Sequence, residues 1–150
     1  MEAMVGEGKV EISKMNGMDI EYEDETFDFC YCNPPFLDQE TYSEEPEEIG
    51  RKVEKEFFDN IFMMQKENNR VIKKGGLIVI VMNDQRKEGN IIPLHSKLIE
   101  VSKEAGLVLH DIVVAEVMSQ QIRLRKKAFE LKRTVKCHEY VMVFKNNGEN

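Results

Sequence analysis

Apolar residues along this 150-residue chain occur in short runs whose periods predict individual strands and helices. Residues Val10–Met15 alternate between apolar and polar, which predicts a short strand that ends at a turn, Asn16-Gly17. Residues Phe27–Cys32 form an apolar, aromatic run that predicts a buried strand. Pro34-Pro35 follows almost at once, and because proline lacks an amide proton and has a fixed φ, the strand must end there.

A long helix and a second strand are predicted next. Apolar residues recur at helical spacing from Arg51 to Val71, and Lys73–Gly76 is expected to close this helix through a glycine cap. The uninterrupted run Leu77–Met82 is typical of a strand buried on both faces of a parallel sheet. A strand, a helix and a second buried strand make a βαβ unit, so we expect the two strands to run in parallel.

The second half of the chain predicts one more helix and two more strands. Pro93 suits the first turn of a helix that runs to about Ala105. Strands are expected at Leu107–Met118 and Cys137–Lys145. The predicted fold class is α/β: one domain over residues 10–145 with a mainly parallel sheet, helices on its faces and an antiparallel final strand. Residues 1–9 are expected to form a disordered leader, and residues 146–150 a polar tail.

Composition and charge narrow the functional class. A hydrophobic content of 41% and a charged content of 33% are typical of soluble globular proteins. The longest apolar run, Leu77–Met82, is far shorter than the roughly 20 residues that cross a bilayer, so we expect no membrane partner. The net charge of −7 argues against coating of nucleic acid by the whole surface. Basic residues nevertheless gather in Ser119–Lys136, which predicts one side that faces a polynucleotide, with a solvated loop as the alternative.

The three cysteines do not predict a metal or disulfide framework. Cys30 and Cys32 are separated by one residue, whereas zinc and thioredoxin motifs have a two-residue gap. We expect both to be small core residues in a reduced, intracellular protein, cytoplasmic or nucleoid-associated.

The residues after the first buried strand carry the strongest chemical signal. Asn33-Pro34-Pro35-Phe36 resembles the Asn/Asp-Pro-Pro-Tyr/Phe signature of S-adenosylmethionine-dependent methyltransferases that act on planar nitrogen, above all the adenine-N6 enzymes. The resemblance implies that the Asn33 side-chain oxygen and the Pro34 carbonyl hold the protons of an exocyclic amine. Phe36 would stack on a base flipped out of its helix. An ordinary strand-ending turn is the alternative, since Asn-Pro and Pro-Pro are common in loops.

Three further segments match the same family. Asn16, Gly17 and Asp19 lie where the family has a Gly-Asp pair near the cofactor's adenine, although Met18 intervenes and a plain turn explains them equally well. Asp84 and Arg86, after the second buried strand, are expected to neighbour the site. The segment His138-Glu139-Tyr140 resembles the family's His-Glu-Tyr, and a capped strand-end histidine is the alternative for His138. The basic stretch before it implies phosphate contacts by the following residues: Arg123, Arg125, Lys126, Lys127 and Arg133.

One family feature has no match in the sequence. The family wraps S-adenosylmethionine with a Phe-x-Gly-x-Gly loop, and no such segment occurs among the nine glycines of this chain. Three explanations are open: a partner subunit carries the loop, the chain binds the cofactor in a divergent way near Asn16–Asp19, or the chain binds nucleic acid without modifying it. A partner subunit or a homodimer is expected as a possible partner besides DNA. The predicted fold is thus a Rossmann-like methyltransferase sheet. The sheet would be incomplete if a partner subunit carries the glycine-rich loop.

The hypothesis from the sequence is methyl transfer from S-adenosylmethionine to an exocyclic base amine, adenine N6 in DNA. The competing hypothesis is a noncatalytic or split-subunit module that binds nucleic acid or a partner protein. Methylation of RNA or of a protein glutamine is a third, because related motifs act on planar amides.

Overall fold

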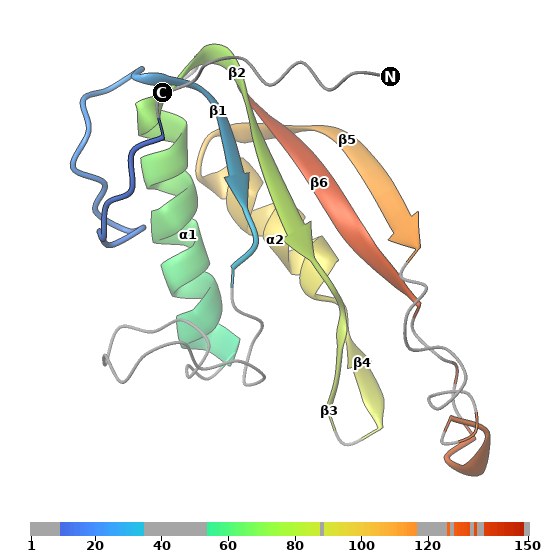
Figure 1. Ribbon diagram of the computed structural model, residues 1–150. Helices are drawn as coiled ribbons and strands as arrows, with labels where there is room; N and C mark the ends of the chain where they lie inside the picture. Colours follow the sequence, from blue (N-terminus) through green and yellow to red (C-terminus); the bar gives the residue numbers. More distant parts are fainter. Residues whose placement is uncertain are drawn as a thin grey trace.

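A four-stranded mixed sheet forms the centre of the protein. The computed structural model describes residues 10–34, 54–87, 89–116, 126, 128–132, 134 and 137–148 (Figure 1). The strand order in the main sheet is β1-β2-β6-β5, and a separate pair, β3 and β4, forms a hairpin. The strands are β1 (Phe27–Cys32), β2 (Ile72–Met82), β3 (Gln85–Lys87), β4 (Asn90–Ile92), β5 (Leu107–Glu116) and β6 (His138–Asn146).

Three of the four strands in the main sheet run in one direction. β1 pairs with β2 in parallel, whereas β6 is antiparallel to both of its neighbours, β2 and β5. β5 therefore runs the same way as β1 and β2. This arrangement confirms the predicted α/β class with a mainly parallel sheet and an antiparallel final strand.

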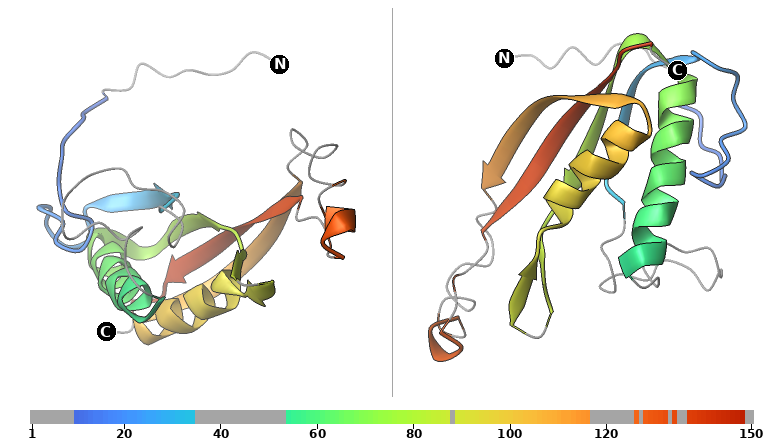
Figure 2. Two further views of the ribbon diagram at one scale, coloured as in Figure 1. Left: turned by 90° about the horizontal axis from the view of Figure 1, so that it is seen from below. Right: turned by 180° about the vertical axis from the view of Figure 1, so that it is seen from behind.

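Both helices cover the same face of the sheet. Figure 2 shows α1 (Glu54–Val71) and α2 (Leu94–Glu104) side by side beneath the strands when the sheet is seen from below. The core lies between these helices and the strands, and burying its apolar surface is the main source of stability. Its most buried apolar side chains are Phe57, Ile61, Ile72, Ile78, Ile80, Met82, Leu94, Leu98, Leu107, Met142 and Phe144. Neither described helix combines the length and apolarity of a membrane span.

A buried polar chain joins the two helices. Gln65 Nε2 of α1 donates to Ser102 Oγ of α2 at 2.7 Å, and Asn68 Nδ2 donates to Gln65 Oε1 at 2.9 Å. Such groups are costly to bury unless they are paired. Their pairing fixes the rotation of α1 relative to α2.

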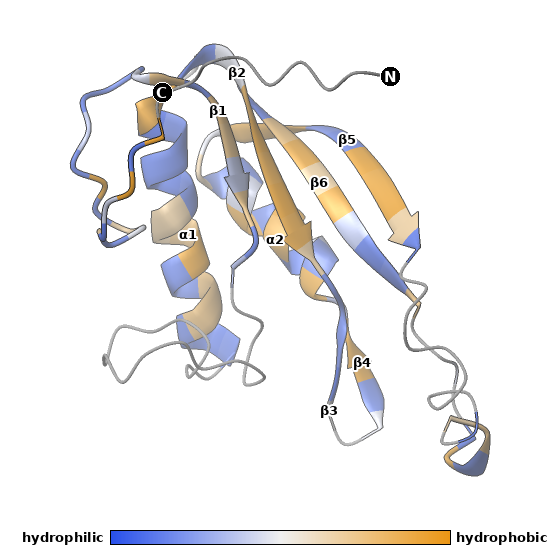
Figure 3. Ribbon diagram, viewed as in Figure 1, coloured by the Kyte–Doolittle hydropathy of each residue, from blue (hydrophilic) through white to orange (hydrophobic). Residues whose placement is uncertain are grey.

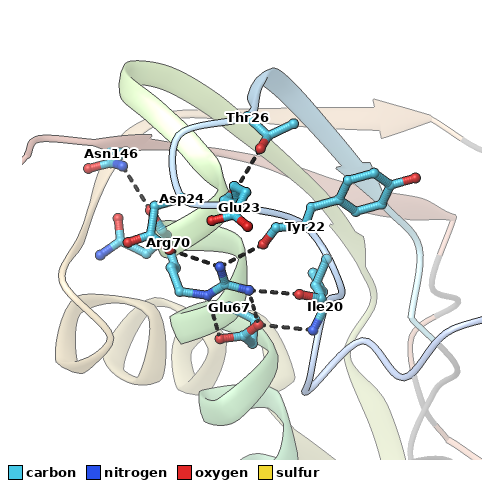
Figure 4. Close-up of polar contacts among 9 residues, drawn as sticks. Ile20, Tyr22, Glu23, Asp24, Thr26, Glu67, Arg70 and Asn146 are labelled. Carbon is cyan, nitrogen blue, oxygen red and sulfur yellow. Dashed lines mark hydrogen bonds and ion pairs between the residues drawn. The ribbon is translucent and has the colours of Figure 1, made fainter.

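The segment before β1 is held against the end of α1 by Arg70 (Figure 4). The Arg70 guanidinium donates to the backbone carbonyls of Ile20 and Tyr22, both at 2.8 Å, and to the Asp24 carboxylate at 2.9 Å. Glu67 completes the cluster: its carboxylate accepts from Arg70 at 2.7 Å and from the Ile20 amide at 2.9 Å. The hydrogen bond from Arg70 holds the pKa of Glu67 below its usual value.

Two predictions from the sequence are wrong. Val10–Met15 is not a strand: Val10 and Ile12 are 86% and 92% exposed, and no strand lies alongside among the described residues. Lys73–Gly76 does not cap α1, because β2 begins at Ile72. These residues instead form an irregularity in the pairing of β1 with β2. Phe27 pairs with Ile72 and Phe29 pairs with Leu77, so a step of two residues in β1 corresponds to a step of five in β2.

Glycines make this irregularity feasible. Gly75 has a φ of +81°, and a Cβ on Gly76 would lie 2.8 Å from the Asp28 carbonyl oxygen. Only glycine tolerates both conditions without strain.

The other predicted elements are present. β1 has the predicted bounds, but the prediction that it is a buried strand is wrong, because none of its six residues is buried. α1 is described from Glu54 onward, and α2 follows Pro93 and ends before Gly106, whose φ is +88°. β5 is described as far as Glu116, and β6 is shifted by one residue from the prediction. The hairpin of β3 and β4 was not predicted, because its strands have only three residues each.

Asn146 provides a first prediction about stability. Its buried amide donates to the carbonyls of Asn69 and Ile72 at 2.9 and 2.7 Å, where α1 passes into β2. Asn146→Ala leaves both carbonyls without this donor, so we expect the free energy of unfolding to fall by about 1–3 kcal/mol. Urea denaturation measures the change. The exposed neighbour provides the matched control, and Asn147→Ala should change stability by less than about 0.5 kcal/mol.

Glu67 provides a second prediction, on pH dependence. Its pKa in the folded state is lowered, so the carboxylate adds stability above the unfolded-state pKa of about 4.3 and loses it as pH falls through the folded value. The stability gap between the parent protein and Glu67→Gln should therefore be full at pH 7 and shrink below about pH 4. Urea denaturation across this range tests it. A difference in unfolding free energy that stays constant with pH would contradict the lowered pKa of Glu67. The control is Glu104→Gln, at an exposed position of α2, which should be as stable as the parent protein at either pH.

Candidate functional site

The site predicted from the sequence lies at the edge of the sheet where β1 and β2 end. Cys32, the last residue of β1, pairs with Ile80, so Asn33 leaves the sheet beside the final residues of β2. Asn33 is exposed and Pro34 is buried. The turn therefore has a buried proline next to an exposed asparagine at the end of β1. Pro35 and Phe36 lie outside the described residues.

The end of β2 contributes a buried acid to the same edge. Asp84 is 8% exposed, and its Oδ1 lies 2.6 Å from His95 Nδ1 and 3.3 Å from the His95 amide nitrogen. Pro93 has no side-chain acceptor to cap α2, so the Asp84 carboxylate takes that position at the helix N-terminus. Asp84 thereby ties the end of β2 to the first turn of α2.

Aromatic rings extend this edge onto β6. The His95 ring is stacked on Tyr140, with centroids 4.2 Å apart and planes inclined by 22°. The His138 ring meets Tyr140 edge-on at 5.0 Å. Tyr140 pairs with Met82, so β2 alone separates these rings from the Asn33 corner. The structure thus brings His138 and Tyr140 to the predicted edge. The stacking His95 was missed, because a lone histidine after Pro93 gives no sequence signal.

Ser96 Oγ lies 3.1 Å from His95 Nε2, which links Asp84, His95 and Ser96 in series. Ser96 directly follows His95 on one exposed helical turn, and we interpret this contact as local to the helix surface.

One orphaned acceptor also lies at the edge. Asn83 follows β2 directly, and its Oδ1 is buried with no hydrogen-bond partner among the described residues. Buried amide oxygens are normally paired, so this atom is an exception at the edge of the sheet.

The segment proposed to hold the cofactor lies beside α1. Asn16 and Asp19 close a turn in which Asn16 Oδ1 accepts from the Met18 amide at 3.0 Å. Gly17 faces the middle of α1, where a Cβ on this glycine would lie 3.9 Å from Met64 Cγ. No hydrogen bond joins this turn to Asn33 among the described residues. The cofactor role of Asn16, Gly17 and Asp19 stays a prediction.

The basic stretch is described only in part. Lys126 is exposed, whereas Arg123, Arg125, Lys127 and Arg133 lie outside the described residues. Arg86, predicted to neighbour the site, donates from β3 to Thr134 Oγ1 at 3.1 Å. This contact brings the hairpin of β3 and β4 next to the basic stretch.

Cys30 and Cys32 behave as core thiols. Both are free, and Cys30 Sγ lies 3.8 Å from Asn68 Oδ1. Burial raises the pKa of Cys32 to about 11, so this thiol is protonated at neutral pH and is a poor nucleophile. Within the described residues, no group of three or more His, Cys, Asp or Glu side chains is placed to hold a metal ion.

Solved structures share this fold. A candidate DNA modification methylase from Thermus thermophilus, complexed with S-adenosyl-L-methionine, aligns over 90% of this chain and 54% of its own, at 18% identity and a TM-score of 0.63. The cytosine-N4-specific PvuII DNA methyltransferase aligns over 84% of this chain and 44% of its own, at 16% identity and a TM-score of 0.61. A SAM-dependent methyltransferase from Methanosarcina mazei aligns over 92% of this chain and 68% of its own, at 14% identity and a TM-score of 0.56.

These similarities confirm the predicted Rossmann-like methyltransferase sheet. The chain spans about half the length of the two DNA methyltransferases. No protein-family model and no curated protein matches the sequence.

Asp84 allows a prediction about how the edge is held together. Asp84→Ala removes the charged partner of His95 and the cap of α2, so we expect a loss of about 1.5–3 kcal/mol in the free energy of unfolding. Urea denaturation measures it. Ser96→Ala removes the outer contact of the same ring at an exposed position, and its loss should be several times smaller. Equal losses would show that Asp84 does not hold the edge.

Proposed function

We propose that this chain is the substrate-binding part of an S-adenosylmethionine-dependent methyltransferase that acts on an exocyclic base amine, adenine N6 in DNA. One observation carries the proposal: Asn33 is exposed, and buried Pro34 anchors it at the carboxyl end of a parallel strand in a methyltransferase-type sheet. Ligands of open α/β sheets bind at this end of the strands.

The chemistry follows from the nature of the amine. An exocyclic amine on an aromatic ring is a weak nucleophile, because its lone pair is delocalised into the ring. Two acceptors, the Asn33 side-chain oxygen and the Pro34 carbonyl, would hold its two protons and favour a more tetrahedral nitrogen. The nitrogen then attacks the methyl carbon in line, the bond from that carbon to sulfur breaks, and the proton leaves afterwards. Alignment supplies most of the acceleration.

Stacking would complete the recognition of the base. Phe36 is the aromatic residue of the motif, and bases extruded from a duplex are commonly held by stacking on such rings. The basic residues of Ser119–Lys136 would bind phosphates and position the polynucleotide without reading its sequence.

The cofactor is proposed from the solved structures. The Thermus thermophilus protein is complexed with S-adenosyl-L-methionine, and the Methanosarcina mazei protein is a SAM-dependent methyltransferase. The PvuII enzyme acts on cytosine N4, an amine of the same chemical class as adenine N6. The choice of adenine rests on the Asn-Pro-Pro-Phe motif.

Asn33→Ala tests the proposal. The protein is isolated from its native cells with its associated polypeptides and incubated with DNA and methyl-labelled S-adenosylmethionine. We expect Asn33→Ala to lower methyl incorporation by about 100-fold or more, because an interaction made at the reacting centre is removed. Asn90→Ala, an exposed asparagine in β4, should leave it unchanged.

Mass spectrometry of the digested DNA identifies the methylated base. N6-methyladenine supports the full proposal, whereas N4-methylcytosine would correct the base. Methyl groups found only on RNA or protein would refute the assignment to DNA. An Asn33→Ala protein as active as the parent would refute the role of the corner.

A further inference from the structure

A short helical turn between β5 and β6 presents an aromatic ring to solvent. It lies at residues 128–130, at the same end of the sheet as the hairpin of β3 and β4 (Figure 1). Ala128 is 6% exposed, whereas the much larger Phe129 is 86% exposed and Leu131 is 52% exposed. The turn therefore buries its smallest residue and leaves its largest apolar side chain in water.

Exposure of this extent distinguishes Phe129 from the other rings of the protein. Among the described aromatic residues Phe129 is the most exposed, and burying such a ring elsewhere would be favourable. Single apolar residues on a surface need no explanation by themselves. What sets Phe129 apart is the charge that surrounds it and the place at which it is held.

Hydrogen bonds hold the turn near the carboxyl edge of the sheet. The Lys132 amide donates to the Phe129 carbonyl at 3.0 Å, and Lys132 has a φ of +49°, so the chain folds back directly after Leu131. Arg86 of β3 donates to Thr134 Oγ1 at 3.1 Å and to the Gly89 carbonyl at 3.2 Å. We call residues 128–132 the aromatic tip. The hairpin that follows Asp84 is thus tied to the chain just after the aromatic tip.

The charge around the aromatic tip is positive. Lys126 and Lys132 are exposed, and the stretch Ser119–Lys136 contains seven lysines and arginines but a single acid, Glu130, in a chain whose net charge is −7. Figure 3 shows hydrophobic colouring on the turn next to hydrophilic colouring. An exposed ring among cations fits a ligand that combines phosphates with flat apolar faces, and nucleic acid has both.

An anionic lipid surface has a related chemistry, but the aromatic tip fits it less well. Helices that lie on membranes bury a broad apolar face in the lipid boundary. The described tip offers only Phe129 and Leu131, which project from a single turn. The edge to which the tip is tied also holds Asn33, where a base is proposed to bind. DNA is therefore the favoured occupant.

The sheet sets the spacing between the aromatic tip and the Asn33 corner. Neighbouring strands lie about 4.8 Å apart, so β1 and β5 are separated by about 14 Å, the length of about four base-pair steps. The aromatic tip follows β5 in the chain, whereas Asn33 follows β1. Phe129 would thus meet a duplex at a position separate from the target base.

We propose that Phe129 inserts as a wedge into the base stack of the DNA that carries the target base, at a step separate from it. Lys126 and Lys132 bind the flanking phosphates. The choice of DNA rests on the proposed function. Apolar side chains that enter a base step kink the duplex. The resulting bend lets the duplex contact the aromatic tip and the Asn33 corner together.

Binding to a duplex whose stack is already interrupted tests the proposal. Fluorescence anisotropy compares an intact DNA duplex with one that has an abasic site, where the cost of unstacking has been removed. We expect the full chain to bind the abasic duplex about tenfold more tightly, and Phe129→Ala to lose this preference, because stacking on an aromatic ring contributes an effect of this size. Phe129→Trp should keep the preference.

Two further variants serve as controls for this preference. Phe29→Ala makes the same substitution at another exposed phenylalanine, in the middle of β1, and should keep the preference of the parent protein. Asn33→Ala should keep it too, because the wedge acts apart from the proposed base site. Loss of the preference in Asn33→Ala would show that the abasic site is recognised at the Asn33 corner instead.

Salt dependence separates the ring from the cations. Replacing Lys126 and Lys132 together by glutamine should weaken binding to both duplexes equally. It should also reduce the slope of log affinity against log salt concentration by about two, because two phosphate contacts are lost. Phe129→Ala should leave the slope unchanged, since stacking releases no counterions. A changed slope in Phe129→Ala would contradict the wedge.

The remaining outcomes also overturn the proposal: no preference in the parent protein, an unchanged preference in Phe129→Ala, or an equal loss in Phe29→Ala. Binding to vesicles of anionic lipid that depends on Phe129, with DNA binding independent of it, would assign the aromatic tip to a membrane. The proposed function is tested separately. A wedge in a protein that methylates no base would refute the function alone. Base methylation without a role for Phe129 in DNA binding would refute the wedge alone.

Discussion

The direction of the two parallel crossovers is the constraint on which the rest of the structure depends. Both connections advance from β1 towards β5, and the right-handed rule then places α1 and α2 on one face. The same constraint brings the carboxyl ends of β1, β2 and β5 to one edge, together with the amino end of β6. Asn33, Asp84 and Tyr140 are far apart in the sequence, but this arrangement makes them neighbours along that edge.

Different side-chain contacts hold the two ends of the sheet. At the amino ends of β1 and β2, Arg70 donates to backbone carbonyls of the segment before β1, and Asn146 donates to two carbonyls where α1 passes into β2. These bonds fix where β1 and β2 begin. At the other end, Pro34 stops β1 and the Asp84–His95 pair turns the chain from β2 into α2. Both ends of the sheet are thus held by side-chain contacts, and the exposed Asn33 lies at the carboxyl edge.

Much of this fold could be predicted from the sequence, because period and turn chemistry are local properties. The prolines after Cys32 and the helical spacing before Val71 identified β1 and α1 directly. Val10–Met15 failed, since alternation produces a strand only where another strand pairs with it. The glycine cap predicted at Lys73–Gly76 failed because the end of α1 is capped by Asn146, which donates to the Asn69 carbonyl. The two residues are 77 positions apart in the sequence, so no local pattern reveals this contact. His95 was missed in the same way, because its partners Asp84 and Tyr140 come from other elements.

The disagreement between pattern and structure at Leu77–Met82 is informative for this reason. Local and global preferences agree in most of a natural protein, and the places where they conflict are commonly functional sites. The run predicts burial on both faces, whereas Leu77 and Val79 on the face opposite the helices stay half-buried, beside the strand that ends at Asn33.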